Sequence, residues 1–266
     1  MKHLLFLLGL VGWMGGVSFA QTLNLFDVND DATSLTEYYN GQAFIFAQDQ
    51  WSGSYNLGVT GTTSGGSSLP NPGRESSGSG SFFADHSFGS TSWSLSGWAQ
   101  GSIDAGLGNP GGTPFPTSAQ TTILSTGLTF YIDTPSNLTI TGSVFESFVG
   151  NDPSILGTVS NQGAIGLYAE VVDGQLFNDY LFSWSTNQGS SGGTYTRNFN
   201  SGVFRLDLLA NAVLSSNVPD AFGTQYSSYD AQLSIGAVPE PGSALFLGTA
   251  ALLPLLRRRR PRPTEN

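Results

Sequence analysis

Apolar residues recur at every second position along much of this chain. The pattern is clearest in residues 138–144, 165–171, 204–208 and 229–235, where apolar and polar side chains alternate. Successive side chains of a β-strand point to opposite faces, so a period of two predicts strands with one buried face. Many short segments of this kind between glycine-rich turns predict an all-β fold, an antiparallel β-sandwich or jelly-roll-like body.

Two local signals refine this expectation. Asp173-Gly174 lies between the alternating segments 165–171 and 176–184, and an Asp-Gly pair in that position predicts a β-hairpin. Residues 203–214 fit a strand in their first half, whereas 208–214 are also compatible with a helical turn.

The long polar stretches are interpreted as connections. Residues 61–80 and 106–116 are rich in glycine, serine and proline, and we expect them to be surface loops or disordered insertions. We expect one extracytoplasmic β-sandwich domain over residues 21–237, with a division near Pro116 as the alternative.

The first twenty residues have the order of a secretory signal peptide. Lys2 and His3 precede an apolar run over residues 4–12, and Ser18-Phe19-Ala20 places small residues at the two positions that a signal peptidase reads. We therefore expect an N-terminal signal helix in residues 1–20 and cleavage after Ala20.

The other end of the chain has a second membrane signal. Residues 242–256 carry no charge, and as a helix they would span about 22 Å, less than the roughly 30 Å hydrocarbon core of a bilayer. The membrane-stop arginines Arg257, Arg258, Arg259 and Arg260 follow directly. Their charge favours a C-terminus in the cytoplasm, and their long side chains extend a short span. We expect a C-terminal transmembrane helix.

The motif Val238-Pro239-Glu240-Pro241, followed by a short apolar helix and an arginine cluster, resembles the PEP-CTERM sorting signal. The resemblance covers residues 238–262 of the 266-residue chain. It implies recognition by an exosortase, a membrane-embedded cysteine-type processing enzyme of Gram-negative bacteria. It further implies transit across the inner membrane, cleavage near the motif, and delivery to the cell surface or the exopolysaccharide matrix.

The charge of the body excludes several partners. Residues 21–237 contain 17 acidic residues against three basic ones, Arg74, Arg197 and Arg205, a net charge of −14. Such a surface repels nucleic acid and anionic lipid. Cysteine is absent from the chain, so an exported domain of this kind depends on a hydrophobic core or on bound ions.

Catalytic residues are few. His86 is the one histidine of residues 21–237; we expect it to be a polar surface residue, and one histidine cannot build a zinc site. Paired carboxylates are the remaining route to a glycan-acting enzyme, with Glu146 and Glu170 on predicted strands and Asp133 and Asp173 nearby. Exposed strand acids are commonly only solvated, so we expect a non-enzymatic body without a cofactor.

A weak calcium cluster is the one metal candidate. Asp27, Asn29 and Asp31 occupy the first, third and fifth places of an EF-hand-like loop. The pattern then fails, because Ala32 replaces the turn glycine and Tyr38 replaces the bidentate acid. An ordinary Asx-rich turn is the preferred interpretation.

Four tryptophans are candidates for stacking on sugar rings: Trp51, Trp93, Trp98 and Trp184. Their alternation with serine and glycine favours a place in the core for most of them. The leading hypothesis is therefore an exported surface or matrix protein with a non-enzymatic body. The alternatives are a carbohydrate-binding module, with polysaccharide as the partner, and a secreted glycan-acting enzyme.

Overall fold

A computed structural model describes most of the body of the chain. The described residues are 21–39, 44–54, 61–71, 76–105, 118–156, 162–172, 174–176, 180–216, 218 and 220–238. The expected signal helix, the apolar segment 242–256 and the arginine cluster lie outside them. Within this part of the chain, no helix is long and apolar enough to cross a membrane.

The described residues form two antiparallel sheets. Sheet A has the strand order β10-β8-β12-β6-β1-β2, with the short β9 paired to β8; sheet B has the order β11-β7-β13-β5-β4-β3. The strands of sheet A are β1 (Asn24–Tyr39), β2 (Phe44–Ser54), β6 (Ser118–Ile132), β8 (Gly163–Val172), β9 (Gln175–Leu176), β10 (Tyr180–Thr186) and β12 (Gly202–Ser216). Those of sheet B are β3 (Gly61–Asn71), β4 (Ser76–Phe88), β5 (Ser92–Asp104), β7 (Ser136–Gly150), β11 (Gly189–Phe199) and β13 (Phe222–Ala237).

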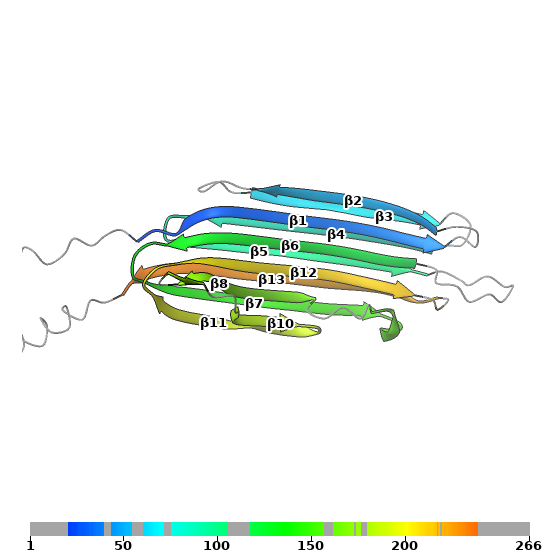
Figure 1. The fold of residues 1–266 in the computed structure, drawn as a ribbon. Helices are drawn as coiled ribbons and strands as arrows, with labels where there is room; N and C mark the ends of the chain where they lie inside the picture. The colour runs from blue at the N-terminus through cyan, green and yellow to red at the C-terminus, as the bar shows by residue number, and fades with distance from the viewer. Residues whose placement is uncertain are drawn as a thin grey trace, which may run out of the picture.

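The two sheets lie face to face, which confirms the predicted sandwich (Figure 1). The strand orders match across the two layers, because contacts join β1 to β4, β2 to β3, β6 to β5, β12 to β13, β8 to β7 and β10 to β11. The alternating residues Leu138, Ile140 and Leu206 point into the space between the sheets and are fully buried. One short 3₁₀ helix, η1 (Pro153–Ile155), precedes β8.

Large aromatic side chains fill one end of the interior, which we call the apolar end. Trp93 contacts Phe88 and Phe130 edge to face, with ring centroids 5.5 and 5.4 Å apart. Phe204 then stacks on Phe130 at 5.5 Å and contacts Phe199. The indole N–H of Trp93 donates to the Gly89 carbonyl at 2.8 Å. This end therefore has a dense aromatic core in which the indole N–H of Trp93 is paired.

At the opposite end of the interior, a layer of small and polar residues lies beside a small apolar cluster that contains Ile103, Ile155 and Leu214. We call this the polar end. Gln120 donates to the hydroxyls of Ser34 and Thr122, each at 3.0 Å, and Thr36 donates to the Gln120 side-chain oxygen. Gly80 of sheet B faces this group, and a Cβ there would overlap all three of Gln120, Thr122 and Ser34. Glycine thus lets the two sheets approach closely over a hydrogen-bonded layer.

Two sequence-based expectations are corrected here. A loop was expected over residues 61–80, but residues 61–71 form strand β3 and residues 76–80 are the first part of strand β4. Gly78 and Gly80 alternate with serine there and fit a close sheet contact. Residues 202–216 form one continuous strand, so the helical turn over 208–214 is wrong. The expected hairpin is confirmed, since Val172 pairs with Gln175. Residues 106–116 lie outside the described residues.

Both ends of the body are fixed to the same turn. The Leu23 N–H donates to the Ser90 carbonyl at 2.8 Å, and the Ile235 N–H donates to the Thr91 carbonyl at 3.0 Å. This turn joins β4 to β5 at the apolar end. The chain therefore enters and leaves the sandwich at one end (Figure 1, left).

Candidate functional site

His86 is buried between the sheets, so its expected place at the surface is wrong. Its exposed fraction is 1 %, and its Nε2 lies 3.0 Å from both carboxylate oxygens of Asp30 on β1. Thr126 donates to Asp30 and also shares a 2.8 Å hydrogen bond with the Tyr229 hydroxyl. Four strands thus meet in one buried polar network. Its inward side chains hold the sheets together and are shielded from a substrate.

The carboxylates proposed for glycan hydrolysis do not meet. Glu146 points from β7 into the interior and is 2 % exposed, whereas Glu170 is half-buried on the outer face of β8. Asp133 is exposed beyond the end of β6, and Asp173 lies outside the described residues. The sandwich therefore separates the two strand glutamates, with Glu146 in the interior and Glu170 on the outer face of sheet A.

Glu146 has an unusual environment. Its Oε1 accepts a 2.7 Å hydrogen bond from the Gln225 amide, and its Oε2 has no hydrogen-bond partner among the described residues. Burial raises the pKa of Glu146 to about 7, and the Gln225 bond opposes part of that rise. Gln225 also accepts from the Val213 N–H, so it connects the carboxyl to the backbone of sheet A.

The calcium candidates lie on a strand. Asp27, Asn29 and Asp31 belong to β1, where alternate residues share one face, and all three are exposed. The Asn29 amide donates to Asp31 at 3.1 Å. Neither an EF-hand-like loop nor the preferred Asx-rich turn forms. No cluster of three or more acidic or histidine side chains that could hold a metal occurs among the residues that the structure describes.

The four tryptophan candidates have different surroundings. Trp93 is in the core, and Trp184 packs against the core from β10, with its ring 4.5 Å from that of Phe182. Trp51 belongs to β2, and its side chain lies outside the described part. Trp98 alone among the described tryptophans is half-buried on the outer face of sheet B, which leaves it as the candidate for contact with a ligand.

Trp98 belongs to a row of four aromatic side chains across the outer face of sheet B. Phe83 on β4 lies directly opposite Trp98 on β5, and their ring centroids are 6.2 Å apart. Tyr226 on β13 follows at 6.1 Å, and Phe145 on β7 follows at 6.3 Å. The ring plane of Trp98 is inclined by 25° to that of Phe83 and by 28° to that of Tyr226. We call these residues the aromatic row.

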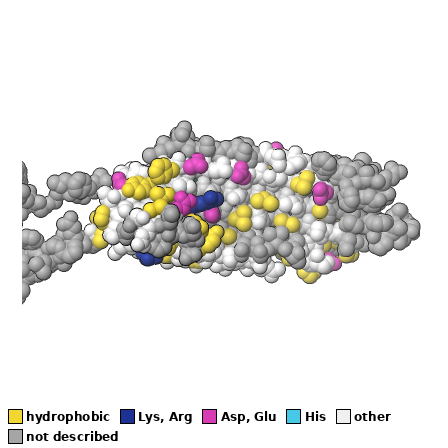
Figure 2. Space-filling model, in the orientation of Figure 1, with side chains coloured by type: hydrophobic (Ala, Val, Ile, Leu, Met, Phe, Trp, Pro, Cys, Tyr) yellow, Lys and Arg dark blue, Asp and Glu magenta, His cyan; other side chains and the backbone are white. Residues whose placement is uncertain are grey.

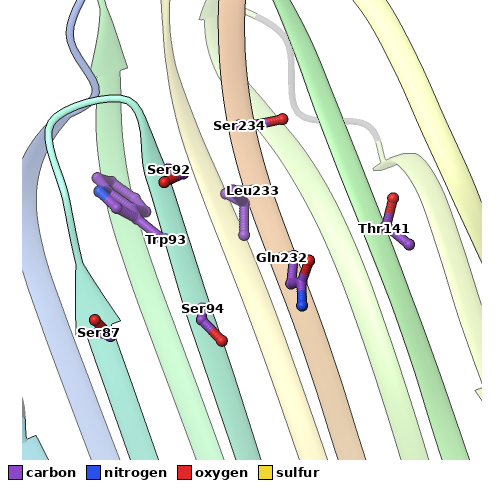
Figure 3. A pocket seen from close by; sticks show the side chains of 8 residues that line it. All are labelled: Ser87, Ser92, Trp93, Ser94, Thr141, Gln232, Leu233 and Ser234. Atoms are coloured by element: carbon purple, nitrogen blue, oxygen red, sulfur yellow. The ribbon is translucent and has the colours of Figure 1, made fainter.

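A hollow lies on the same face, nearer the apolar end. Its exposed side chains come from four neighbouring strands and carry hydroxyl or amide groups (Figure 3): Ser87, Ser92, Ser94, Thr141, Gln232 and Ser234. It has a volume of about 260 Å³, slightly below the range of ordinary small-molecule pockets. It lies four residues from the aromatic row on β4, β5 and β7, a distance of about 14 Å, and six residues from Tyr226 on β13.

Asp85 and Asp230 lie between the hollow and the aromatic row, on either side of Ser96. None of the strands β4, β5, β7 and β13 contains lysine or arginine. The other described surface is also poor in positive charge: the view in Figure 2 shows scattered acidic side chains and little dark blue. The outer face of these four strands is therefore uncharged or negative.

The sequence identified one residue of the aromatic row and missed three. Phe83, Phe145 and Tyr226 occupy outward positions, opposite in phase to the buried Phe82, Val144 and Tyr229. The signal in the sequence that could have identified them is an aromatic residue at a position where the alternation predicts an outward, polar side chain. Their meeting in one row depended on the strand order β7-β13-β5-β4.

Neither protein-family models nor curated proteins give a match for this chain.

Proposed function

We propose that this chain is an exported, non-enzymatic protein of the cell surface or exopolysaccharide matrix, sorted through its PEP-CTERM-like segment by an exosortase. The observation that carries the proposal is the place where the sandwich ends. Strand β13 ends at Ala237, and the proline-flanked motif begins at the next residue. Cleavage near Glu240 would therefore leave every described strand in the body.

The local chemistry of the motif supports processing. Each proline has a fixed φ and disfavours helical backbone at the residue before it. Glu240 is held between two prolines, so we expect an extended segment that fits the binding cleft of a processing enzyme. The arginines that follow the apolar segment favour a cytoplasmic C-terminus, which would place the body on the other side of the membrane.

The hydrogen bonds of Leu23 and Ile235 to one turn imply how the body of the precursor would be oriented relative to the membrane. Signal and sorting segments would both leave from the apolar end of the sandwich. A precursor held by its C-terminal helix would therefore direct the polar end away from the membrane.

The test is the C-terminus of the mature protein. Full-length protein is expressed in its host with and without the exosortase, and the C-terminus of surface-exposed material is determined by mass spectrometry. We expect loss of the arginine-rich tail only when the enzyme is present. Replacement of both Pro239 and Pro241 by alanine should block that loss, and Pro263→Ala, beyond the arginines, should not. Surface protein that retains Arg257–Arg260 in cells with the enzyme would refute the proposal.

A further inference from the structure

We propose that the aromatic row on sheet B binds an uncharged polysaccharide, with sugar rings stacked on Phe83, Trp98, Tyr226 and Phe145. This goes beyond the proposed sorting function and does not depend on it. Outward aromatic side chains are unusual on the solvent face of an antiparallel sheet, where polar residues are the rule. Phe145 is 42 % exposed, and the other three are half-buried.

The core does not account for the row. The same strands place Phe82, Leu95, Val144 and Tyr229 inside, all fully or almost fully buried. The four outward rings contact one another in sequence across β4, β5, β13 and β7. They form a continuous apolar strip one ring wide, bordered along both sides by hydroxyl, amide and carboxylate groups.

Charge selects the class of ligand. The four strands carry no positive residue, and Asp85 and Asp230 lie in the adjacent row of outward residues. Acidic polysaccharides, nucleic acids and anionic lipid would be repelled. A second copy of this face would bring its own aspartates and is disfavoured for the same reason. An uncharged polyhydroxylated ligand is not repelled, and its hydroxyls donate well to carboxylates.

The chemistry of the strip fits a pyranose chain. One face of a sugar ring presents C–H groups, which are attracted to the negative face of an aromatic ring. Its edge presents hydroxyls, for which Ser96, Gln100 and Ser228 lie beside the rings on the same face. Repeated rings about 6 Å apart give a chain of sugars several equivalent contacts, so the row favours a polymer over a single sugar.

The test uses full-length protein and a panel of polysaccharides of stated charge. Cellulose, xylan and dextran are the neutral probes, polygalacturonate is the acidic probe and chitosan is the cationic probe. We expect retention by at least one neutral polysaccharide, unchanged at about 1 M salt, where charges are screened within about 3 Å. Trp98→Ala and Tyr226→Ala should each weaken it about ten-fold, the scale of losing one stacked ring. Trp98→Phe should retain part of the affinity.

Phe26→Ala is the matched control, since Phe26 is an exposed aromatic residue on sheet A. It should leave retention unchanged, and circular dichroism should show that every variant is folded. The proposal is overturned by failure to bind any neutral probe, by binding that salt abolishes, or by equal effects of Phe26→Ala and Trp98→Ala. Sedimentation that shows a dimer dissociated by Trp98→Ala would assign the row to self-association instead. None of these outcomes depends on processing at the C-terminus.

Discussion

The space between the two sheets is filled in different ways at the two ends of the sandwich. At the apolar end, Trp93, Phe130 and Phe204 fill the space between the sheets with large rings. At the polar end, Gly80 brings the sheets so close that Gln120 and Ser34 fill the remaining space. Burial of apolar area stabilises the first end, whereas hydrogen bonds in a tightly fitted layer stabilise the second. The polar end should therefore tolerate added volume least.

The largest effect is expected at the apolar end. Trp93→Ala removes a fully buried indole that contacts two other rings, and we expect a loss of about 3–5 kcal/mol in the free energy of unfolding. Urea denaturation followed by circular dichroism measures it. Trp98→Ala, which removes the same side chain from the outer face, should cost less than half as much. Equal losses would contradict the assignment of Trp93 to the core.

The next effect tests the close approach at the polar end. Gly80→Ala adds one methyl group where Gln120, Thr122 and Ser34 already meet, and overpacking of this kind costs about 1–3 kcal/mol. Gly236→Ala is the control, because a Cβ there meets nothing within 4 Å. It should be neutral or stabilise by about 0.4–1 kcal/mol. Similar behaviour of the two variants would show that the sheets are farther apart at Gly80.

The smallest effect is a pH dependence, also at the polar end. The pKa of Glu146 is about 7 in the folded protein against an ordinary 4.5, so the folded state binds this proton more tightly. The stability that it contributes is complete below about pH 4.5 and is lost as the pH rises through 7. Glu146→Gln keeps the hydrogen-bonding shape without the charge.

The measurement is the melting temperature of the parent protein and of Glu146→Gln at several pH values from 5 to 8. The melting temperature of Glu146→Gln should rise relative to that of the parent as the pH rises, because only the parent has a buried carboxyl group at this position to ionise. The other titrating groups are common to both proteins. A constant difference over this range would mean that Glu146 titrates near its ordinary value.

The difference between the two ends also explains which strands could be predicted from the sequence. Alternation with large apolar residues predicted β7, β8, β12 and β13 and their buried faces. It failed over residues 61–80, because Gly78 and Gly80 carry no hydrophobic signal and serine and glycine also form loops. Their role depends on Gln120, forty positions away, which no local pattern connects to them.

The buried network and the aromatic row were missed for a related reason. His86 is in phase with Phe82 and Phe88 on β4, but only the neighbouring sheet supplies Asp30 to pair with it. Phe83, Tyr226 and Phe145 become neighbours only once the strand order is known. Periodicity shows which face a side chain occupies, whereas long-range pairing determines which residues share it.

The exit of the chain through β13 has a mechanical consequence. This strand lies inside sheet B and pairs with β5 on one side and β7 on the other along nearly its whole length. Tension applied at Val238 along the strand would load many interstrand hydrogen bonds at once, because these bonds lie perpendicular to the pull. A cell-surface tether attached there would shear two ladders together instead of peeling one bond at a time.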